Sequence, residues 1–293
     1  MNEYDAPVEI VREAVARALG EDLGPLGDIT AALVPADAQA AADVVARAGG
    51  VIAGTQCASE TFAQLDGTVR VEWLVDDGSA AGPGTKLGRV SGPLRAVLTG
   101  ERTALNFLCH LSGVATATRR FVEAAGDRVR IWDTRKTLPG LRALEKAAVR
   151  AGGGANHRGS LSDFVLVKDN HLAGLTITDA VQRALETWPG RAVEVECDRF
   201  EQVVEAISAG ATMVLLDNMS TDQVRACVET ARESAPRGFL VEISGGITLE
   251  NVRAYADTGA DLISTSVITQ SAAALDIGFD LEVQGSVERE VGS

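Results

Sequence analysis

From residue 128 onward, the chain alternates short apolar runs with segments of helical spacing. The apolar runs predict strands at 129–133, 164–168, 192–197, 213–217, 239–243 and 262–266. Helical patterns follow most of them, at 140–151, 176–187, 200–209, 221–234 and 248–258. Strands that alternate with helices predict a parallel sheet with right-handed crossovers, which is either open and doubly wound or closed into a barrel.

Polar side chains follow all six predicted strands. The six sets are Asp133/Arg135/Lys136, Lys168/Asn170/His171, Glu196/Asp198, Asp217/Asn218, Ser244/Gly245/Gly246 and Thr265/Ser266. In a parallel barrel all the carboxyl ends of the strands open at one mouth, whereas an open sheet uses mainly the ends at its switch point. Polar residues at the ends of all six strands therefore favour a six-unit TIM-like α/β barrel.

The residues before the barrel have a different pattern. A helical pattern from Val8 to Leu19 ends at the turn 24–28, and period-two alternation at 69–73 and an apolar run at 86–97 predict strands. A long helical pattern follows from Glu101 to Ala125, with Gly113 as a candidate break. We therefore expect an α/β protein with an N-terminal α+β sandwich domain at 1–112, completed by 271–293, and a barrel domain at 113–270.

The charge balance limits the class of partner. The net charge is −14 at pH 7, so a broad basic surface for nucleic acid is not expected. No run of about 18 apolar residues predicts a membrane span, and the acidic N-terminus is unlike a secretory signal, so we expect a cytoplasmic protein. The four cysteines are widely spaced and predict reduced, packed thiols.

Positive charge is nevertheless concentrated in one short part of the chain. Three of the four lysines and two of the three histidines lie between residues 133 and 171. We call the following residues the basic cluster: Arg135, Lys136, His157, Arg158, Lys168 and His171. Guanidinium forks match carboxylates in a bidentate way, so the cluster predicts an anionic small substrate, and a planar dicarboxylate fits best. The plainer alternative is ordinary ion pairing with Asp133, Asp163 and Asp169.

The histidines allow two interpretations. His157 and His171 are either general acids or hydrogen-bond donors to the anion, or else they serve as loop caps or solvated residues. His110 lies on an amphipathic helix and is expected to be structural.

Acidic residues end two neighbouring predicted strands. Glu196 and Asp217 could hold Mg²⁺ together with substrate phosphates, or hydrogen-bond ribose hydroxyls. They could also simply balance Lys136 and Lys168. Glu194 shares a strand face with Glu196, and the sequence leaves open which of the two matters more.

The turn Ser244-Gly245-Gly246 follows the fifth strand and precedes a predicted helix. Backbone N–H groups at such a turn, with a helix N-terminus behind them, suit a phosphate. Phosphate sites of barrels recur in the loops after the last two strands, and here Thr265 and Ser266 follow the sixth.

Six segments, taken in order, resemble the quinolinate phosphoribosyltransferase family. They are 101–106, 133–137, 152–158, 168–171, 216–219 and 244–247, and the resemblance runs from about residue 19 to residue 280. It implies transfer of phosphoribosyl from phosphoribosyl pyrophosphate to quinolinate with decarboxylation, which yields nicotinate mononucleotide, pyrophosphate and CO₂ and requires Mg²⁺.

The resemblance also implies site residues and an assembly. The quinolinate carboxylates would be held by Arg135, His157, Arg158 and Lys168, together with Arg102 from the second copy in a homodimer that shares its active sites. Lys136, Glu196, Asp217 and Ser244–Gly246 would hold the phosphoribosyl group and its metal, with Glu196 and Asp217 as metal ligands. The residues expected to be catalytic are Lys136, Lys168, Glu196 and Asp217. Assembly beyond the dimer is left open.

Two residues depart from the family pattern. Ser266 stands where the family has a glycine, and Gln270 where it has a phosphate-facing histidine. Both can donate hydrogen bonds, so we expect them to contact phosphate. The departures leave two alternatives open, a diverged paralogue for another pyridine carboxylate and a non-catalytic anion-binding homologue. A third alternative, a Schiff-base lyase that uses Lys168, is disfavoured by the arginines and the glycine turn.

Overall fold

The computed structural model describes residues 4–284 of the chain, which folds as two compact units. The first unit comprises the residues up to 117, residues 138–152 and those from 272 onward. The second unit comprises residues 118–137 and 153–271. Residues 1–3 and 285–293 lie outside the described residues, and with them the end of the segment that we expect to complete the N-terminal domain.

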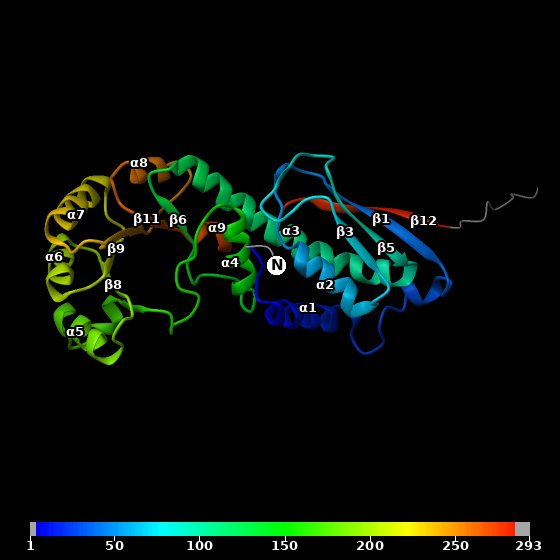
Figure 1. Ribbon diagram of the computed structural model, residues 1–293, viewed down its shortest axis with the longest axis horizontal. Helices are drawn as coiled ribbons and strands as arrows, with labels where there is room; N and C mark the ends of the chain where they lie inside the picture. Colours follow the sequence, from blue (N-terminus) through cyan, green and yellow to red (C-terminus); the bar gives the residue numbers. More distant parts are fainter. Residues whose placement is uncertain (1–3, 285–293) are drawn as a thin grey trace, which may run out of the picture. The chain divides into compact units, whose positions relative to one another are not determined.

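The first unit contains an antiparallel sheet with helices on one face (Figure 1). Its four strands, in sheet order, are β12 (Ile277–Gln284), β1 (Gln39–Ala46), β5 (Lys86–Pro93) and β3 (Arg70–Trp73). A two-stranded sheet pairs β2 (Gly50–Val51) with β4 (Ala80–Ala81). The helices are α1 (Val8–Leu23), the short 3₁₀ helix η1 (Ala31–Leu33), α2 (Thr55–Leu65), the first part of α3 (Leu94–Ala125) and α4 (Arg142–Ala151).

Small side chains let the sheet and the helices of this unit pack closely. The central strand β1 has the sequence QAAADVVA, and Ala42, Val44 and Ala46 are fully buried on one of its faces. They join Phe62 of α2 and Leu108 of α3 in one apolar core. Ala41 and Val45 on the other face are buried as well, so small apolar side chains cover both faces of this central strand.

Helix α3 passes through Gly113 without a break, contrary to the interruption that the sequence suggested. A Cβ at Gly113 would lie 2.2 Å from the backbone oxygen of Ala273. The glycine therefore allows another part of the chain to approach the helix closely, and it does not end the helix. The helix also begins at Leu94, earlier than predicted, since the strand β5 stops at Pro93.

The second unit contains a parallel six-stranded sheet. The strands are β6 (Arg130–Trp132), β7 (Val165–Val167), β8 (Val193–Cys197), β9 (Met213–Asp217), β10 (Leu240–Ser244) and β11 (Leu262–Ser264), and the sheet order is β6-β11-β10-β9-β8-β7. Strands that are consecutive in sequence are thus neighbours from β7 to β11, and β6 closes on β11. This is the strand order of the predicted six-unit α/β barrel.

A seam remains between β6 and β7 in place of direct pairing. The segment before β7 fills it, since Ala155 forms a parallel bridge with Trp132. Asp133 donates its N–H to the Ala155 oxygen at 3.2 Å, and Ala155 donates to the Ile131 oxygen at 2.8 Å. The residues that follow Ala155 are thereby brought to the carboxyl ends of the strands.

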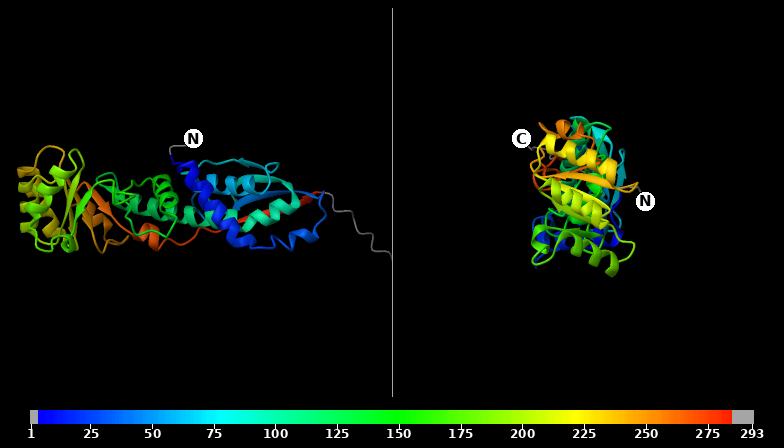
Figure 2. Two further views of the ribbon diagram at one scale, coloured as in Figure 1. Left: turned by 90° about the horizontal axis from the view of Figure 1, so that it is seen from below. Right: turned by 90° about the vertical axis from the view of Figure 1, so that its left-hand side faces the viewer.

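Helices lie along the outside of this sheet (Figure 1). They are α5 (Ile177–Thr187), α6 (Phe200–Ala209), α7 (Thr221–Ser234) and the short α8 (Val252–Ala256), with the 3₁₀ helix η2 (Asp169–His171) and α9 (Val267–Gln270) at strand ends. Figure 2 shows α5, α6 and α7 side by side, as their mutual packing requires. A capping box from Ser220 to Gln223 begins α7.

Two further expectations are tested by the structure. All four cysteines are free in the structure; Cys57, Cys197 and Cys227 are buried as expected, and Cys109 is partly exposed. Among residues 4–284, no helix combines the length and apolar character needed to cross a membrane.

Candidate active site

A cavity of about 340 Å³ lies at the carboxyl ends of the strands in the second unit. Its lining includes eight of the residues predicted from the sequence, namely Arg135, Lys136, His157, Arg158, Lys168, Glu196, Asp217 and Ser244. Thr134, Leu166, Leu215 and Ser264 complete the wall. The strand ends therefore converge on one site, as a parallel barrel requires.

Asp133 organises the segment that fills the seam. It is fully buried and follows β6 directly, where its carboxylate accepts the Asn156 Nδ2–H at 2.8 Å and the His157 main-chain N–H at 2.9 Å. Two bonds to one buried carboxylate fix the position of the chain at His157. Arg158 comes next in the chain and lies in the cavity wall.

His157 is bonded within the protein through both ring nitrogens. Its Nδ1 accepts the main-chain N–H of Arg158 at 2.8 Å, and its Nε2 lies 3.2 Å from Glu194 Oε2. The ring lies edge-on to Trp132 and tilted against Phe164, with centroids 5.5 and 5.1 Å apart. The imidazole is therefore held by neighbouring rings and at both nitrogens.

Two guanidinium groups share the cavity. Arg158 is only 8% exposed, and its Cζ lies 5.8 Å from the centroid of the Phe164 ring. Burial, together with the positive charge of Arg135, lowers the pKa of Arg158 from its usual value. Two like charges that line one cavity repel each other, so the site is suited to an anion.

Lys168 directly follows β7 and faces the carboxylate of the neighbouring strand. Its ammonium group forms an ion pair with Glu196, and both side chains remain partly exposed. The main-chain N–H of Lys168 is donated to His171 Nδ1 at 3.0 Å. His171 thus contacts the backbone of Lys168 and does not line the cavity.

Two fully buried acids lie behind His157. Glu194 Oε1 and both oxygens of Glu242 make no hydrogen bond of normal geometry within the described part of the chain. Burial raises the pKa of Glu194 to about 7, and burial together with the charge of Glu194 raises the pKa of Glu242 to about 8. A proton on Glu242 supplies a donor between the two acids, so this pair adds less negative charge to the site than two carboxylates would.

The turn after β10 depends on its glycine. Gly245 has φ +85°, and a Cβ there would lie 2.3 Å from Asn218 Oδ1. Asn218, which also has a positive φ, donates its N–H to the Ser244 oxygen at 3.1 Å and its amide to Asp217 at 2.8 Å. The ends of β9 and β10 are thus joined, with Ser244 and Asp217 facing the same cavity.

The sequence predicted a helix at 248–258, directly after this turn, and this prediction is wrong in its bounds. Helix α8 starts only at Val252 and has five residues. The side chain of Asn251 accepts the Thr248 N–H at 2.8 Å and donates to the Gly246 oxygen at 2.9 Å. These bonds stabilise turns at 248–251 in place of the expected helix start, so the turn lacks the long helix behind it that the sequence suggested.

Five predicted site residues do not line this cavity. Gly245 and Gly246 adjoin Ser244, Ser266 precedes the short helix α9 and Gln270 ends it, and Arg102 is exposed on α3 in the first unit. The α9 segment is nevertheless tied to the site, because Thr269 donates its hydroxyl to the Lys136 main-chain oxygen at 2.7 Å.

Sequence reasoning missed Thr134, Ser264 and Glu242. Thr134 accepts the Lys136 N–H at 2.9 Å and sits between residues that were singled out. Ser264 ends β11 one residue before the pair that was chosen. Glu242 lies two residues before Ser244, so it faces the same side of β10, and this period-two spacing is the signal that could have revealed it.

The carboxylates in the cavity fit the metal that the sequence implies. Glu196 and Asp217 offer partly exposed oxygens on neighbouring strands, which is the donor type that Mg²⁺ takes together with substrate phosphates. A second set of donor atoms within 4.8 Å of one another belongs to His157, Glu194 and Glu242. That set is buried and includes a nitrogen, so it does not suit Mg²⁺.

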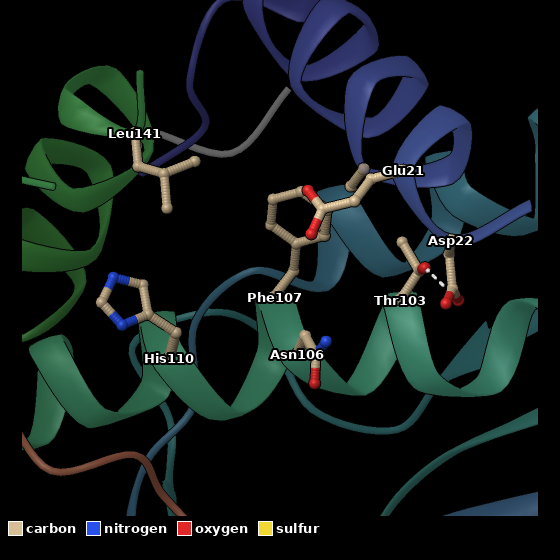
Figure 3. A pocket seen from close by; sticks show the side chains of 8 residues that line it. Glu21, Asp22, Thr103, Asn106, Phe107, His110 and Leu141 are labelled. Atoms are coloured by element: carbon tan, nitrogen blue, oxygen red, sulfur yellow. Dashed lines mark hydrogen bonds between the residues drawn. The ribbon is translucent and has the colours of Figure 1, made fainter. Parts of the chain in front are cut away.

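A separate cavity of about 300 Å³ lies in the first unit, between α1, α3 and the turn before α4 (Figure 3). Its wall includes Glu21, Thr103 and His110. His110 Nε2 lies 2.8 Å from Glu145, which is fully buried and accepts the Leu138 N–H at 3.3 Å through its other oxygen. His110 thus bonds α3 to the segment containing α4, in keeping with the expected structural role.

Comparison with known sequences identifies two matched regions. The profile described as quinolinate phosphoribosyl transferase, C-terminal domain, matches residues 114–280. The profile of the N-terminal domain of the same description matches residues 28–112.

Individual relatives match over almost the whole chain. The nicotinate-nucleotide pyrophosphorylase (carboxylating) of Mycobacterium leprae is 42% identical over 282 residues, which cover 94% of this chain and 99% of that protein. The probable nicotinate-nucleotide pyrophosphorylase (carboxylating) of Bacillus subtilis is 41% identical and covers 92% of each. The solved nicotinate-nucleotide pyrophosphorylase of Francisella tularensis has a TM-score of 0.89 at 36% identity, over 97% of this chain and 99% of that one.

Proposed function

The chain belongs to the quinolinate phosphoribosyltransferase family, and on that premise we propose that the cavity of the second unit is where it transfers phosphoribosyl to quinolinate. The other substrate is phosphoribosyl pyrophosphate. The products are nicotinate mononucleotide, pyrophosphate and CO₂, so the enzyme serves NAD biosynthesis.

The positive charge that converges on this cavity supports the assignment most strongly. Arg135, Lys136, Arg158 and Lys168 all line it. Of the nearby acids, Glu242 has its pKa raised to about 8 by burial and by the charge of Glu194, and Glu196 is paired with Lys168. A doubly ionised pyridine dicarboxylate supplies the balancing charge, and the two guanidinium groups match its carboxylates.

Phosphoribosyl transfer needs mainly positioning and electrostatic stabilisation. Departure of pyrophosphate gives the ribose C1 oxocarbenium character, and the pyridine nitrogen then attacks that carbon. We assign Lys136, Asp217 and the Ser244–Gly246 turn to the phosphoribosyl group. Ser266 and Gln270 contact phosphate in this assignment as hydrogen-bond donors.

Decarboxylation follows at the ring carbon next to the nitrogen. The bond to the carboxyl group breaks, its electron pair stays on the ring carbon, and that carbon then takes a proton. Fixed cations near this carbon stabilise the developing negative charge more than they stabilise the substrate. Arg135, Arg158 and Lys168 are the groups that we assign to this role.

Mg²⁺ is the proposed metal, with Glu196 and Asp217 as its protein ligands. When bound, it would neutralise charge on the departing pyrophosphate. Its oxygen ligands would be completed by the substrate's phosphates, which suits a site that offers only two carboxylates.

We further propose that the active enzyme is a homodimer in the cytoplasm. Arg102 is exposed on α3 and does not line the cavity of the second unit, so its expected contact with quinolinate is assigned to a second copy of the chain. Two copies related by a two-fold axis would each receive Arg102 from the other.

The proposed function is tested by turnover of the purified protein with quinolinate, phosphoribosyl pyrophosphate and Mg²⁺. We expect nicotinate mononucleotide and CO₂ in equal amounts. Parallel assays with pyridine carboxylates that lack one of the two carboxyl groups should give little product. Preference for one of those acids would point to the diverged paralogue, and tight quinolinate binding without product would point to the non-catalytic homologue.

A further inference from the structure

We propose that His157 and His171 are positioning residues for two positively charged side chains that bind the substrate. The ring of His157 accepts the main-chain N–H of Arg158, and the ring of His171 accepts that of Lys168. The inference rests on the proposed function, because it concerns how the quinolinate-binding cations are held. It replaces the expectation that His157 itself grips a substrate carboxylate.

The hydrogen bonds of His157 leave the ring no proton to donate to substrate. Nδ1 accepts the Arg158 N–H at 2.8 Å, so this nitrogen carries no proton. The ring proton is therefore on Nε2, which lies 3.2 Å from Glu194 Oε2 and 3.6 Å from Glu242 Oε2. Both acids are fully buried, so the proton points away from the cavity and into the protein.

This arrangement fixes the backbone at Arg158. The N–H of His157 is bonded to Asp133 and the N–H of Arg158 to the His157 ring, so two successive main-chain donors are held by side chains. The ring itself is held in place, because Trp132 and Phe164 contact it and Glu194 bonds its other nitrogen. With its main chain fixed, the Arg158 guanidinium loses less conformational freedom when it binds an anion.

His171 makes the same kind of contact with the main chain of Lys168. Its Nδ1 accepts the Lys168 N–H at 3.0 Å, where β7 ends and the helix η2 begins. Lys168 lines the cavity, whereas His171 does not. The main chains of Arg158 and Lys168, two positively charged residues of one pocket, are thus each held by a histidine ring that accepts a hydrogen bond. In this role the histidine ring does not bind the substrate as a charged group.

A double-mutant cycle on quinolinate affinity separates positioning from direct binding. We expect Arg158→Ala to weaken binding about 100-fold and His157→Ala about 10-fold, as for loss of a charged hydrogen bond and of a neutral one. If His157 acts through Arg158, the double variant binds about as weakly as Arg158→Ala alone. If the two losses multiply, His157 contacts the substrate by itself and the proposal fails.

The substitutions His157→Asn and His171→Asn give a second comparison. In each of them the amide oxygen can accept the same main-chain N–H that Nδ1 accepts in the wild type. We expect each to keep quinolinate affinity within about threefold of wild type, whereas His171→Ala loses about fivefold and adds nothing to Lys168→Ala. Equal losses for the asparagine and alanine variants would contradict the acceptor role.

Nitrogen-15 spectra of the imidazole rings test the tautomer without any substitution. The chain has three histidines, so the signals can be assigned from single variants. We expect His157 Nδ1 to be unprotonated and Nε2 to carry the proton, both in the free protein and with quinolinate bound. A proton on Nδ1, or a new bond from the ring to quinolinate, would overturn the proposal.

Turnover of the wild type is measured first, so that the two proposals can fail separately. If wild-type protein makes nicotinate mononucleotide but the binding losses multiply, the positioning role is wrong and the function stands. If wild-type protein makes none, the proposed function is wrong, and the ring spectra still decide whether His157 holds the Arg158 main chain.

Discussion

At the scale of single residues, the site is dominated by how the protein places like charges together. Burial and then the charge of Arg135 lower the pKa of Arg158, because the two guanidinium groups line the same cavity. Backbone contacts hold these side chains in place, and the nearby Glu242, whose pKa burial and the charge of Glu194 raise to about 8, offsets little of their charge. A bound dianion would offset the repulsion between the two guanidinium groups. Part of the affinity for the substrate therefore comes from the loss of this repulsion.

Arginine geometry gives the first prediction. Arg158→Lys keeps the charge but removes the bidentate fork, so we expect KM for quinolinate to rise about 10- to 100-fold with a smaller change in kcat. Steady-state kinetics at saturating phosphoribosyl pyrophosphate provide the measurement. Arg232→Lys, an exposed residue of α7 that pairs with Asp261, is the matched control and should behave as wild type. Unchanged KM in Arg158→Lys would remove Arg158 from the binding site.

The raised pKa of Glu242 gives the second prediction. The carboxyl of Glu242 ionises in the unfolded protein at a pKa of 4.5 and in the folded protein at a pKa of about 8. Wild-type protein therefore loses stability as the pH rises between these two values, because ionisation favours the unfolded state. Glu242→Gln cannot ionise, so its free energy of unfolding should rise relative to wild type across this window, by up to about 3 kcal/mol. Denaturant unfolding of both proteins between pH 5 and pH 8 measures the difference.

The control for this titration is an exposed acid of the same unit. Glu229 lies on α7 and is exposed, so Glu229→Gln makes the same chemical change outside the buried pair. A stability difference for Glu242→Gln that does not change with pH would show that Glu242 ionises equally in the folded and unfolded protein.

At the scale of elements, the predicted strands match the structure closely because the periodic signal is strong. The strand predicted at 213–217 is β9 to the residue, and the helices at 200–209 and 221–234 are α6 and α7. The capping box at Ser220 and the glycine after α6 mark their ends by local chemistry. Such signals act within a few residues, so one sequence is enough to show them.

Two predictions about helices were wrong, the break at Gly113 and the start of α8. In both, the helix bounds depend on a contact that the local sequence pattern does not encode. Gly113 continues α3 because another segment packs on it, and α8 starts late because Asn251 bonds to the preceding turn. Within the site, residues that follow strands were found because all strand ends meet in one place. Glu242 was missed because it lies inside a strand, where a buried acid is unexpected.

The joined ends of β9 and β10 give the third prediction. Gly245→Ala would place Cβ 2.3 Å from Asn218 Oδ1 at a φ of +85°. We expect a loss of about 2–4 kcal/mol in the free energy of unfolding and at least about tenfold weaker binding of phosphoribosyl pyrophosphate, because the turn must move. Thermal or denaturant unfolding and calorimetric binding measure the two effects.

Gly190 provides a control with nearly the same φ. It has φ +83°, and no atom lies within 4 Å of the methyl carbon that alanine would add, so Gly190→Ala incurs only the backbone cost of about 1 kcal/mol. The excess in Gly245→Ala then measures the contact with Asn218. Equal effects in the two variants would mean that the turn adapts to the methyl group.

At the scale of the whole molecule, the proposal that two copies of the chain share their active sites gives the fourth prediction. Arg102→Ala and Lys136→Ala should each be inactive as pure dimers, because every site in them lacks one required cation. Subunits of the two variants that are mixed and allowed to re-associate should regain about a quarter of wild-type activity, since half the dimers are mixed and each has one intact site. Each variant re-associated with itself is the control, and no recovery on mixing would assign Arg102 to its own subunit.

The path of the chain between the two units has a consequence for how such a protein can change over generations. The backbone leaves the second unit after residue 137, adds α4 to the first unit, and returns at residue 153. No single crossover in the gene can therefore exchange one unit and leave the other whole. Exchange of one whole unit would need several crossovers at once, so we expect the two units to be inherited together.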